Sequence, residues 1–242
     1  MRADDDAARA GSAGRAPRGL PRAVEVPVAL AAIFVLAPAL LLAAAAIVLT
    51  CGRPVLFRQL RVGRGGRPFT LIKLRTMRPE RGCGVTAAGD ARVTAVGRLL
   101  RRTKLDEVPE LWNVARGDMA LVGPRPEVPV FVDLGNPRWQ RALSVRPGLT
   151  DPVTIALRDE ERLLGQVRGD REAFYREVWL PRKLDGCIRY LERRSPLADI
   201  EVLIRTVVAV LAPHATPAGA WRGLVEPEAP TSEGVVHGTP SP

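Results

Sequence analysis

Asp106 and Glu107 form the acidic pair of this sequence that is best suited to chemistry on a phosphoryl group. Pro109 follows them, and the apolar residues between Val108 and Ala115 repeat at helical spacing, so the sequence predicts the pair at a helix N-terminus. The free N–H groups and the dipole of a helix start favour an ionised carboxylate and also attract phosphate oxygens. Because neighbouring helical residues point about 100° apart, we expect the two carboxylates to have different roles.

Arginines surround this acidic pair in the sequence. Arg101 and Arg102 precede it, and the stretch Gly123–Pro126 holds Arg125 between two prolines in a stiff turn. An arbitrary Asp-Glu pair at a helix start more often serves only to cap the helix. Fixed cations on both sides of the pair instead indicate a site for a substrate that carries phosphate.

An uncharged apolar run from Val26 to Leu49 has the length and composition of a membrane helix. Pro38 lies near its middle, where a proline removes a helix hydrogen bond and kinks the axis. Each half would reach only about 18 Å, which is short of the ~30 Å hydrocarbon core. Arginines flank the run on both sides, without the asymmetry of a simple span. The sequence therefore favours a re-entrant membrane helix, with a spanning helix as the alternative.

The rest of the chain predicts an α+β fold that is mostly helical. Two strand-like runs within Pro54–Met77 flank the turn-rich Gly63–Gly66 and predict a β-hairpin. The stretch Glu172–Tyr190 predicts two short amphipathic helices, interrupted at Pro181, that either pack against the core or lie in the lipid headgroup layer. A further helix is expected over Leu197–Leu211.

Several stretches, taken together and in order, resemble the bacterial sugar transferases, the monotopic polyprenyl-phosphate phosphoglycosyl transferases. These stretches are PVLFRQLRVGRGGRPFTLIKLRTM, TKLDEVPELWNVARGDMALVGPRP, RPGLTDP, LPRKL and LADIEVLIRT. The resemblance covers Val26 to Leu211. It implies a monotopic membrane protein with a re-entrant helix broken near its middle, a cytoplasmic catalytic domain, and amphipathic helices that rest on the membrane surface.

The same resemblance implies an activity and its site. The enzyme would transfer a sugar-1-phosphate from a nucleotide sugar, by default a UDP-sugar, to polyprenyl phosphate and release UMP. This is the first membrane step of exopolysaccharide or other glycoconjugate synthesis, at the cytoplasmic face of the inner (cytoplasmic) membrane. Asp106 would be the nucleophile, and Glu107 would help to hold Mg²⁺ at the diphosphate. The resemblance also implies substrate-binding roles for Lys73, Arg101, Arg125 and Asp199.

The sequence departs from the family pattern at three places. Ala37-Pro38 stands where the family has Ser-Pro, Arg22–Glu25 only approximates the usual basic-acidic start of the membrane segment, and RPGLTDP follows another branch, so the sugar is undefined. The competing hypotheses are a non-catalytic membrane-tethered scaffold and a binder of an anionic polymer. The intact acidic pair among cations argues against both.

We expect four segments: a disordered arm over residues 1–22, the re-entrant membrane helix over 23–52, a cytoplasmic catalytic domain over 53–212 and a disordered tail over 213–242. The 36 Lys and Arg residues against 26 Asp and Glu give a net charge of +10, which draws the chain toward an anionic partner such as membrane lipid. The sequence contains no recognisable nucleic-acid-binding module, so we expect no nucleic acid partner. The three cysteines lack metal-binding spacing, and we assign them no role.

Overall fold

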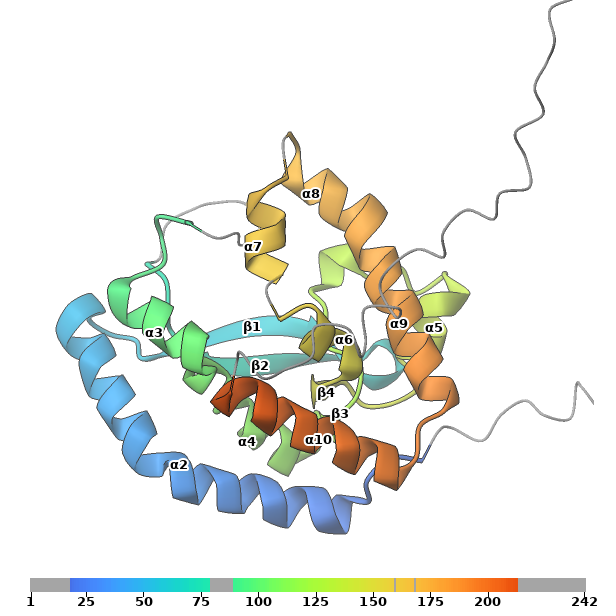
Figure 1. Ribbon diagram of the computed structural model, residues 1–242, viewed down its shortest axis with the longest axis horizontal. Helices are drawn as coiled ribbons and strands as arrows, with labels where there is room; N and C mark the ends of the chain where they lie inside the picture. Colours follow the sequence, from blue (N-terminus) through green and yellow to red (C-terminus); the bar gives the residue numbers. More distant parts are fainter. Residues whose placement is uncertain (1–17, 79–88, 159, 168, 213–242) are drawn as a thin grey trace, which may run out of the picture.

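The computed structural model of the protein describes residues 18–78, 89–158, 160–167 and 169–212. The predicted tail and all but the last residues of the predicted arm lie outside this described part. The described part is mostly helical and contains two small two-stranded sheets, which agrees with the predicted α+β class (Figure 1).

The predicted membrane segment forms one long helix, α2 (Arg22–Cys51), of 30 residues. Its most apolar 18-residue window has a mean hydropathy of 2.8 and is only 11% buried, so α2 is long and apolar enough to cross a membrane. The helix runs unbroken through Pro27 and Pro38, and it bends in its middle, as Figure 1 shows. Large apolar side chains, among them Phe34 and Leu49, are more than four-fifths exposed along it. No residue in the part of the chain that the structure describes covers them.

The first turn of α2 is bonded to the rest of the protein. Arg22 donates hydrogen bonds to the carbonyl groups of Val114 and Ala115. Glu25 is fully buried, and its carboxylate pairs with the guanidinium of Arg146 at 2.7 Å and accepts a hydrogen bond from a backbone N–H. The basic-acidic start that only approximates the family pattern therefore makes specific contacts with the folded domain.

The last turn of α2 is bonded to the same domain. Arg75 donates to the carbonyl groups of Cys51 and Gly52, which are left without partners where the helix ends. Earlier in this half, Ala43 and Ile47 pack in a small core cluster with residues of the hairpin and of the following helix. Both ends of the apolar helix are thus attached to one folded unit.

The predicted β-hairpin is confirmed. Strands β1 (Leu56–Val62) and β2 (Pro68–Leu74) pair antiparallel, with Phe57 opposite Lys73. The connecting turn η1 (Arg64–Gly66) ends in two glycines with φ of 67° and 77°, which side chains other than glycine rarely adopt.

The acidic pair lies between two helices rather than at the start of one. Helix α3 (Ala95–Thr103) ends at Lys104, whose φ of 58° turns the chain, and the 3₁₀ turn η2 (Leu105–Glu107) follows. Helix α4 (Glu110–Arg116) begins only after Pro109. The predicted helix start is therefore one turn too early, because Pro109 has no N–H to join the pair and α4 in a single hydrogen-bonded helix.

The turn that carries Arg125 is fixed by a short parallel sheet. Strands β3 (Ala120–Val122) and β4 (Gly148–Thr150) pair with each other, and their ends meet at Gly123. A side chain on Gly148 would place its Cβ 2.1 Å from the backbone nitrogen of Gly123, so only glycine allows this approach.

The C-terminal half is a set of helices that close one side of the molecule (Figure 1). The predicted break at Pro181 is wrong: the chain is helical without interruption from Arg171 to Glu192, because a wider π-helical turn before the proline accommodates its missing N–H. This run packs into the main core through Trp179 and Leu184, which favours the core-packing alternative over the headgroup layer. The elements are η3 (Pro129–Phe131), α5 (Pro137–Ala142), α6 (Pro152–Ala156), α7 (Glu160–Gly165), α8 (Arg171–Phe174), η4 (Tyr175–Trp179), α9 (Leu180–Glu192) and α10 (Pro196–Leu211).

Candidate active site

A cavity of about 1730 Å³ lies between the hairpin, the 3₁₀ turn η2 and the α6–α9 region. Five of the six site residues predicted from the sequence line this cavity. They are Lys73, Arg101, Asp106, Glu107 and Arg125, and they come from β2, α3, η2 and the turn after β3. Packing therefore brings together charged side chains that are up to 52 positions apart in the sequence (from 73 to 125).

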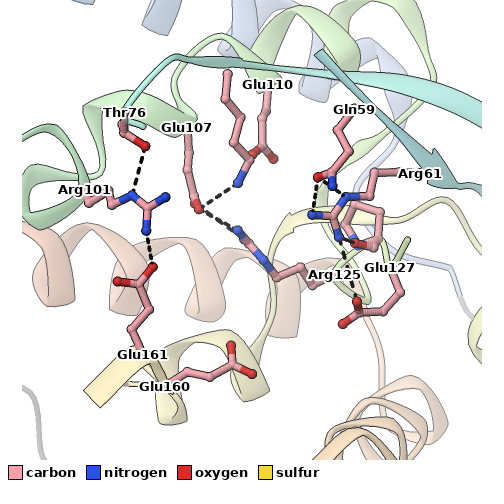
Figure 2. A network of polar contacts seen from close by, with 12 residues as sticks. Gln59, Arg61, Thr76, Arg101, Glu107, Glu110, Arg125, Glu127, Glu160 and Glu161 are labelled. Atoms are coloured by element: carbon pink, nitrogen blue, oxygen red, sulfur yellow. Dashed lines mark hydrogen bonds and ion pairs between the residues drawn. The ribbon is translucent and has the colours of Figure 1, made fainter. Parts of the chain in front are cut away.

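Glu107 is held between two cations (Figure 2). Its Oε1 atom lies 2.5 Å from Nη2 of Arg125 and 3.1 Å from Nζ of Lys73, and its Oε2 atom lies 3.4 Å from Nη1 of Arg125. Burial alone would raise the pKa of Glu107, but the charges of Arg125 and Lys73 together outweigh burial and hold this pKa well below its usual range. Glu107 is therefore ionised at neutral pH.

Asp106 lies in a different environment from its neighbour. The residue is 7% exposed, and its Oδ1 atom has no hydrogen-bond partner among the described residues. Burial, and after it the negative charge of Glu107, raise the pKa of Asp106. A poorly solvated carboxylate that no hydrogen bond stabilises is a reactive nucleophile toward an electrophilic centre. The two acids thus lie in different environments, since Glu107 is firmly paired and Asp106 is not, and their different roles stay a prediction.

Glu110 is a further acid that sequence reasoning missed. It is 1% exposed, and its Oε1 atom lies 3.0 Å from Nζ of Lys73, which it shares with Glu107. Burial is the main cause that raises the pKa of Glu110, and the charge of Lys73 opposes it. The one feature of the sequence that could have indicated Glu110 is its spacing. It lies three positions after Glu107, which places both side chains on the same side of a helical turn.

Arg101 reaches the cavity from the last turn of α3. Its Nε atom donates to Oγ1 of Thr76 at 2.9 Å, and its Nη1 atom lies 2.6 Å from Oε1 of Glu161 on α7 (Figure 2). Glu161 is half exposed, so this ion pair is open to competition by another anion.

The end of the cavity beyond Arg125 contains a second polar cluster that the sequence analysis did not identify. Nζ of Lys183 lies 3.2 Å from Oε1 of Glu127 and 3.1 Å from Oε1 of Glu160, and the hydroxyl of Tyr175 donates to Glu127 at 2.6 Å. Burial would raise the pKa of Glu127, but Lys183 and then Arg61 outweigh it and lower this pKa. Glu127 directly follows the Gly-Pro-Arg-Pro turn, and this position is the one feature of the sequence that could have indicated the second cluster.

Asp199 does not line the cavity. It is completely buried in α10, where Nη2 of Arg194 lies 2.9 Å from Oδ2 and the hydroxyl of Tyr190 donates to Oδ1 at 2.6 Å. The backbone N–H of Leu20 also donates to it, at 2.9 Å. These contacts join α9, α10 and the segment before α2, so a substrate-binding role for Asp199 stays a prediction and has no support from its position.

The oxygen donors at the acidic pair fit a magnesium ion that takes most of its ligands from a substrate. Within the described ranges, no group of three or more acidic, histidine or cysteine side chains could hold a metal ion. Mg²⁺ commonly binds through one or two carboxylates together with substrate phosphates and water. Glu107 and the unpartnered Oδ1 atom of Asp106 provide such carboxylate oxygens.

Comparisons with known proteins concern the family of the chain. The family model described as "Bacterial sugar transferase" matches residues 17–213. A UDP-glucose:undecaprenyl-phosphate glucose-1-phosphate transferase of Caulobacter vibrioides is 42% identical over 181 residues, which are 72% of this chain and 63% of the relative. The exopolysaccharide production protein PSS of Rhizobium leguminosarum bv. phaseoli is 32% identical over 203 residues, 79% of this chain and 95% of the relative.

A third relative matches over a shorter stretch. It is a UDP-N-acetylgalactosamine-undecaprenyl-phosphate N-acetylgalactosaminephosphotransferase of Aeromonas hydrophila, 39% identical over 135 residues, which are 53% of this chain and 32% of the relative. The matched part of the chain thus spans less than two thirds of the Caulobacter and Aeromonas proteins. The family match covers the hairpin, the acidic pair and the arginine turn. This chain belongs to the bacterial sugar transferase family.

Proposed function

We propose that this protein transfers a sugar-1-phosphate from a UDP-sugar to polyprenyl phosphate and releases UMP, in the first membrane step of exopolysaccharide or other glycoconjugate synthesis. The names of the Caulobacter and Aeromonas relatives, which state a sugar-phosphate transfer to undecaprenyl phosphate, support this reaction class. The observation that carries the proposal is the unpartnered, buried carboxylate of Asp106 next to Glu107, which Lys73 and Arg125 hold in place.

The reaction proceeds in two displacements. In the first, a carboxylate oxygen of Asp106 attacks the phosphorus that bears the sugar, a bond to that phosphorus forms, and the bond to the departing UMP oxygen breaks. In the second, an oxygen of the lipid phosphate attacks the same phosphorus, and the bond to Asp106 breaks to restore the carboxylate. No proton transfer is needed for the nucleophile, because Asp106 attacks in its ionised form.

The cations around Glu107 reduce the repulsion between an anionic nucleophile and an anionic diphosphate. Lys73 and Arg125 lie beside the acidic pair before substrate binds, so little reorganisation is required when charge develops on the phosphoryl oxygens. Arg101 meets a further phosphate oxygen when substrate displaces the half-exposed Glu161. A bound Mg²⁺ ion, held by Glu107 and the diphosphate, would neutralise charge on the leaving group.

We further propose that α2 is re-entrant and that both of its ends lie at the cytoplasmic face of the inner membrane. Arg22 and Glu25 attach its first turn to the catalytic domain, and Arg75 attaches its last turn to the same domain. A straight helix that crosses the bilayer would separate these two ends by about 45 Å, at 1.5 Å per residue over 30 residues. The bend seen in Figure 1 supports a helix that enters and leaves on one side.

Other apolar side chains extend the membrane-facing surface that we propose. Leu197, Ile204 and Leu211 of α10 are more than half exposed, and so is Trp112 of α4. Residues of α10 and Ala29 of α2 belong to one core cluster, so the exposed residues of α10 lie on an element that shares this core with the membrane helix. An amphipathic helix in this position rests in the headgroup layer.

The reaction is tested with the purified full chain in nanodiscs that contain undecaprenyl phosphate. A panel of UDP-sugars is added with Mg²⁺, and UMP and the lipid-linked product are measured. We expect UMP release with at least one sugar and a matching lipid diphosphate-sugar product. Membrane binding without UMP release from any donor would instead favour the scaffold hypothesis.

A further inference from the structure

The cavity has an apolar end that the chemistry at Glu107 does not use. Its wall there consists of Val48, in the last turns of α2, and of Leu56 and Phe57, at the start of β1. These side chains are 38%, 38% and 45% exposed, although about half of the residues that line the cavity are charged. Exposed apolar side chains inside a charged cavity indicate a ligand with an apolar part.

The register of the hairpin places this apolar wall next to a phosphate-binding group. Phe57 is directly opposite Lys73 in the antiparallel pair, so the two side chains share one face of the hairpin. Opposite residues have Cβ atoms about 4.5–5.5 Å apart. A hydrocarbon chain against Phe57 would therefore end beside Lys73, whose Nζ atom is 3.1 Å from Glu107.

Two arginines at the apolar end are free to bind an anion. Arg53 and Arg58 line the cavity there, and neither side chain forms a hydrogen bond or an ion pair with any residue that the structure describes. Lys73 and Arg125, by contrast, are already paired with Glu107. A phosphate that arrives at this end meets unpaired cations without displacing a carboxylate.

This end of the cavity also adjoins the membrane helix. Val48 belongs to α2, and Arg75, which lines the cavity, donates to the carbonyl groups of Cys51 and Gly52 at the helix end. A lipid that leaves the bilayer along α2 reaches the cavity here. A water-soluble nucleotide sugar has no need of an apolar approach.

We propose that the region between the last turns of α2 and the start of β1 is the acceptor site of the enzyme. Its ligand is a long-chain isoprenoid phosphate, with the chain against Val48 and Phe57 and the phosphate at Lys73, where Arg53 is an unpaired cation at the same end of the cavity. The donor then occupies the opposite side of the acidic pair, toward Arg125. This inference rests on the proposed transferase function and adds the position of its second substrate.

The first test compares variants of the two groups with controls on the hairpin. Phe57→Ala and Arg53→Ala are matched with Leu60→Ala and Arg67→Ala, because Leu60 and Arg67 are exposed and do not line the cavity. Undecaprenyl phosphate and the donor are varied separately in nanodiscs. We expect kcat/KM for the acceptor to fall roughly tenfold in each cavity variant, through the loss of an apolar contact or a charged hydrogen bond. The donor KM should stay within about twofold, and so should all parameters of the controls.

The second test does not depend on turnover. Phe57→benzoylphenylalanine should cross-link to undecaprenyl phosphate on irradiation and give the expected increase in mass, whereas Leu60→benzoylphenylalanine should not. Vesicle co-sedimentation separates acceptor binding from general attraction to lipid headgroups, and we expect all variants to bind vesicles equally.

Several results would overturn the acceptor site. These are a raised donor KM with unchanged acceptor kinetics, equal effects at Leu60 and Phe57, equal cross-linking at both positions, or a loss of vesicle binding that parallels the loss of activity in Arg53→Ala. An inactive wild-type protein would count against the transferase function itself, and cross-linking at position 57 would still report on the site.

Discussion

Replacing Asp106 by Asn should abolish transfer and at the same time stabilise the folded protein. Asp106 is buried, its Oδ1 atom has no partner among the described residues, and Glu107 carries a negative charge beside it. Burial first, and Glu107 second, raise the pKa of Asp106, so the folded protein disfavours the charge that the reaction needs. Asn keeps the shape and removes this charge.

The size of the effect follows from the missing hydrogen bond. A buried acceptor without a partner destabilises a protein by about 1–3 kcal/mol, and more when it is charged. The new amide group of Asn also needs a partner, so we expect a net gain of about 1 kcal/mol. For a chain of this size that gain raises the unfolding temperature by about 2–4 °C. An acid with a raised pKa stabilises the fold when protonated and loses this contribution as pH rises through that pKa, so the gain should grow from acidic to neutral pH.

Glu107→Gln is the matched control, and its effect should have the opposite sign. Glu107 is the shared partner of Lys73 and Arg125, and its loss leaves the partly buried Arg125 without its carboxylate and Lys73 with Glu110 alone. Removal of one partner from a buried pair costs about 3–5 kcal/mol, and we expect about 2–3 kcal/mol here because the side chain is 15% exposed. Unfolding temperatures of both variants and the wild type are compared in one detergent, together with UMP release. A lower unfolding temperature for Asp106→Asn would contradict an unfavourable buried charge at this position, and transfer at the wild-type rate would exclude Asp106 as the nucleophile.

Three further predictions concern the arginine turn, acid pH and topology. Arg125→Lys should lower kcat/KM for the donor about ten- to hundredfold, because lysine cannot reproduce the forked contact with Glu107; a wild-type value would remove Arg125 from the donor site. On acidification, transfer should be lost before the fold, since the pKa of Asp106 is raised and that of Glu107 is lowered, and a pH–rate profile beside a pH–unfolding profile checks this order. Arg18→Cys and Arg67→Cys are introduced separately into a protein without its native cysteines. In intact cells both new cysteines should resist a membrane-impermeant thiol reagent, and both should react after permeabilisation. If only one of the two reacts in intact cells, α2 spans the membrane.

Local pattern was enough to predict several elements of this protein. The alternating strands and glycine turn of the hairpin, the long apolar helix and the helix over residues 197–211 depend on residues close in sequence, and all three are present. The cations on either side of the acidic pair also converge as expected, since Lys73, Arg101 and Arg125 line one cavity with it.

Burial by distant segments could not be predicted in the same way. Glu110 resembles any helical glutamate in the sequence, and only the packing of α4 against β2 places it under Lys73. Asp199 is buried where it pairs with Arg194 and accepts a hydrogen bond from the backbone of Leu20. Leu20 and Asp199 are 179 positions apart in the sequence. The break expected at Pro181 also failed, because a π-helical turn is a tertiary adjustment that the proline itself does not reveal.

The covalent intermediate on Asp106 gives the most direct test of the central claim. The wild-type protein is incubated with its UDP-sugar and Mg²⁺ without lipid acceptor, quenched in acid and digested with trypsin. Cleavage after Lys104 and Arg116 yields one peptide, Leu105–Arg116, that contains the whole acidic pair. We expect a mass increase of one sugar phosphate on this peptide, assigned by fragmentation to Asp106 and lost when polyprenyl phosphate is added. UMP release without any adduct, or an adduct on Glu107 in place of Asp106, would contradict it.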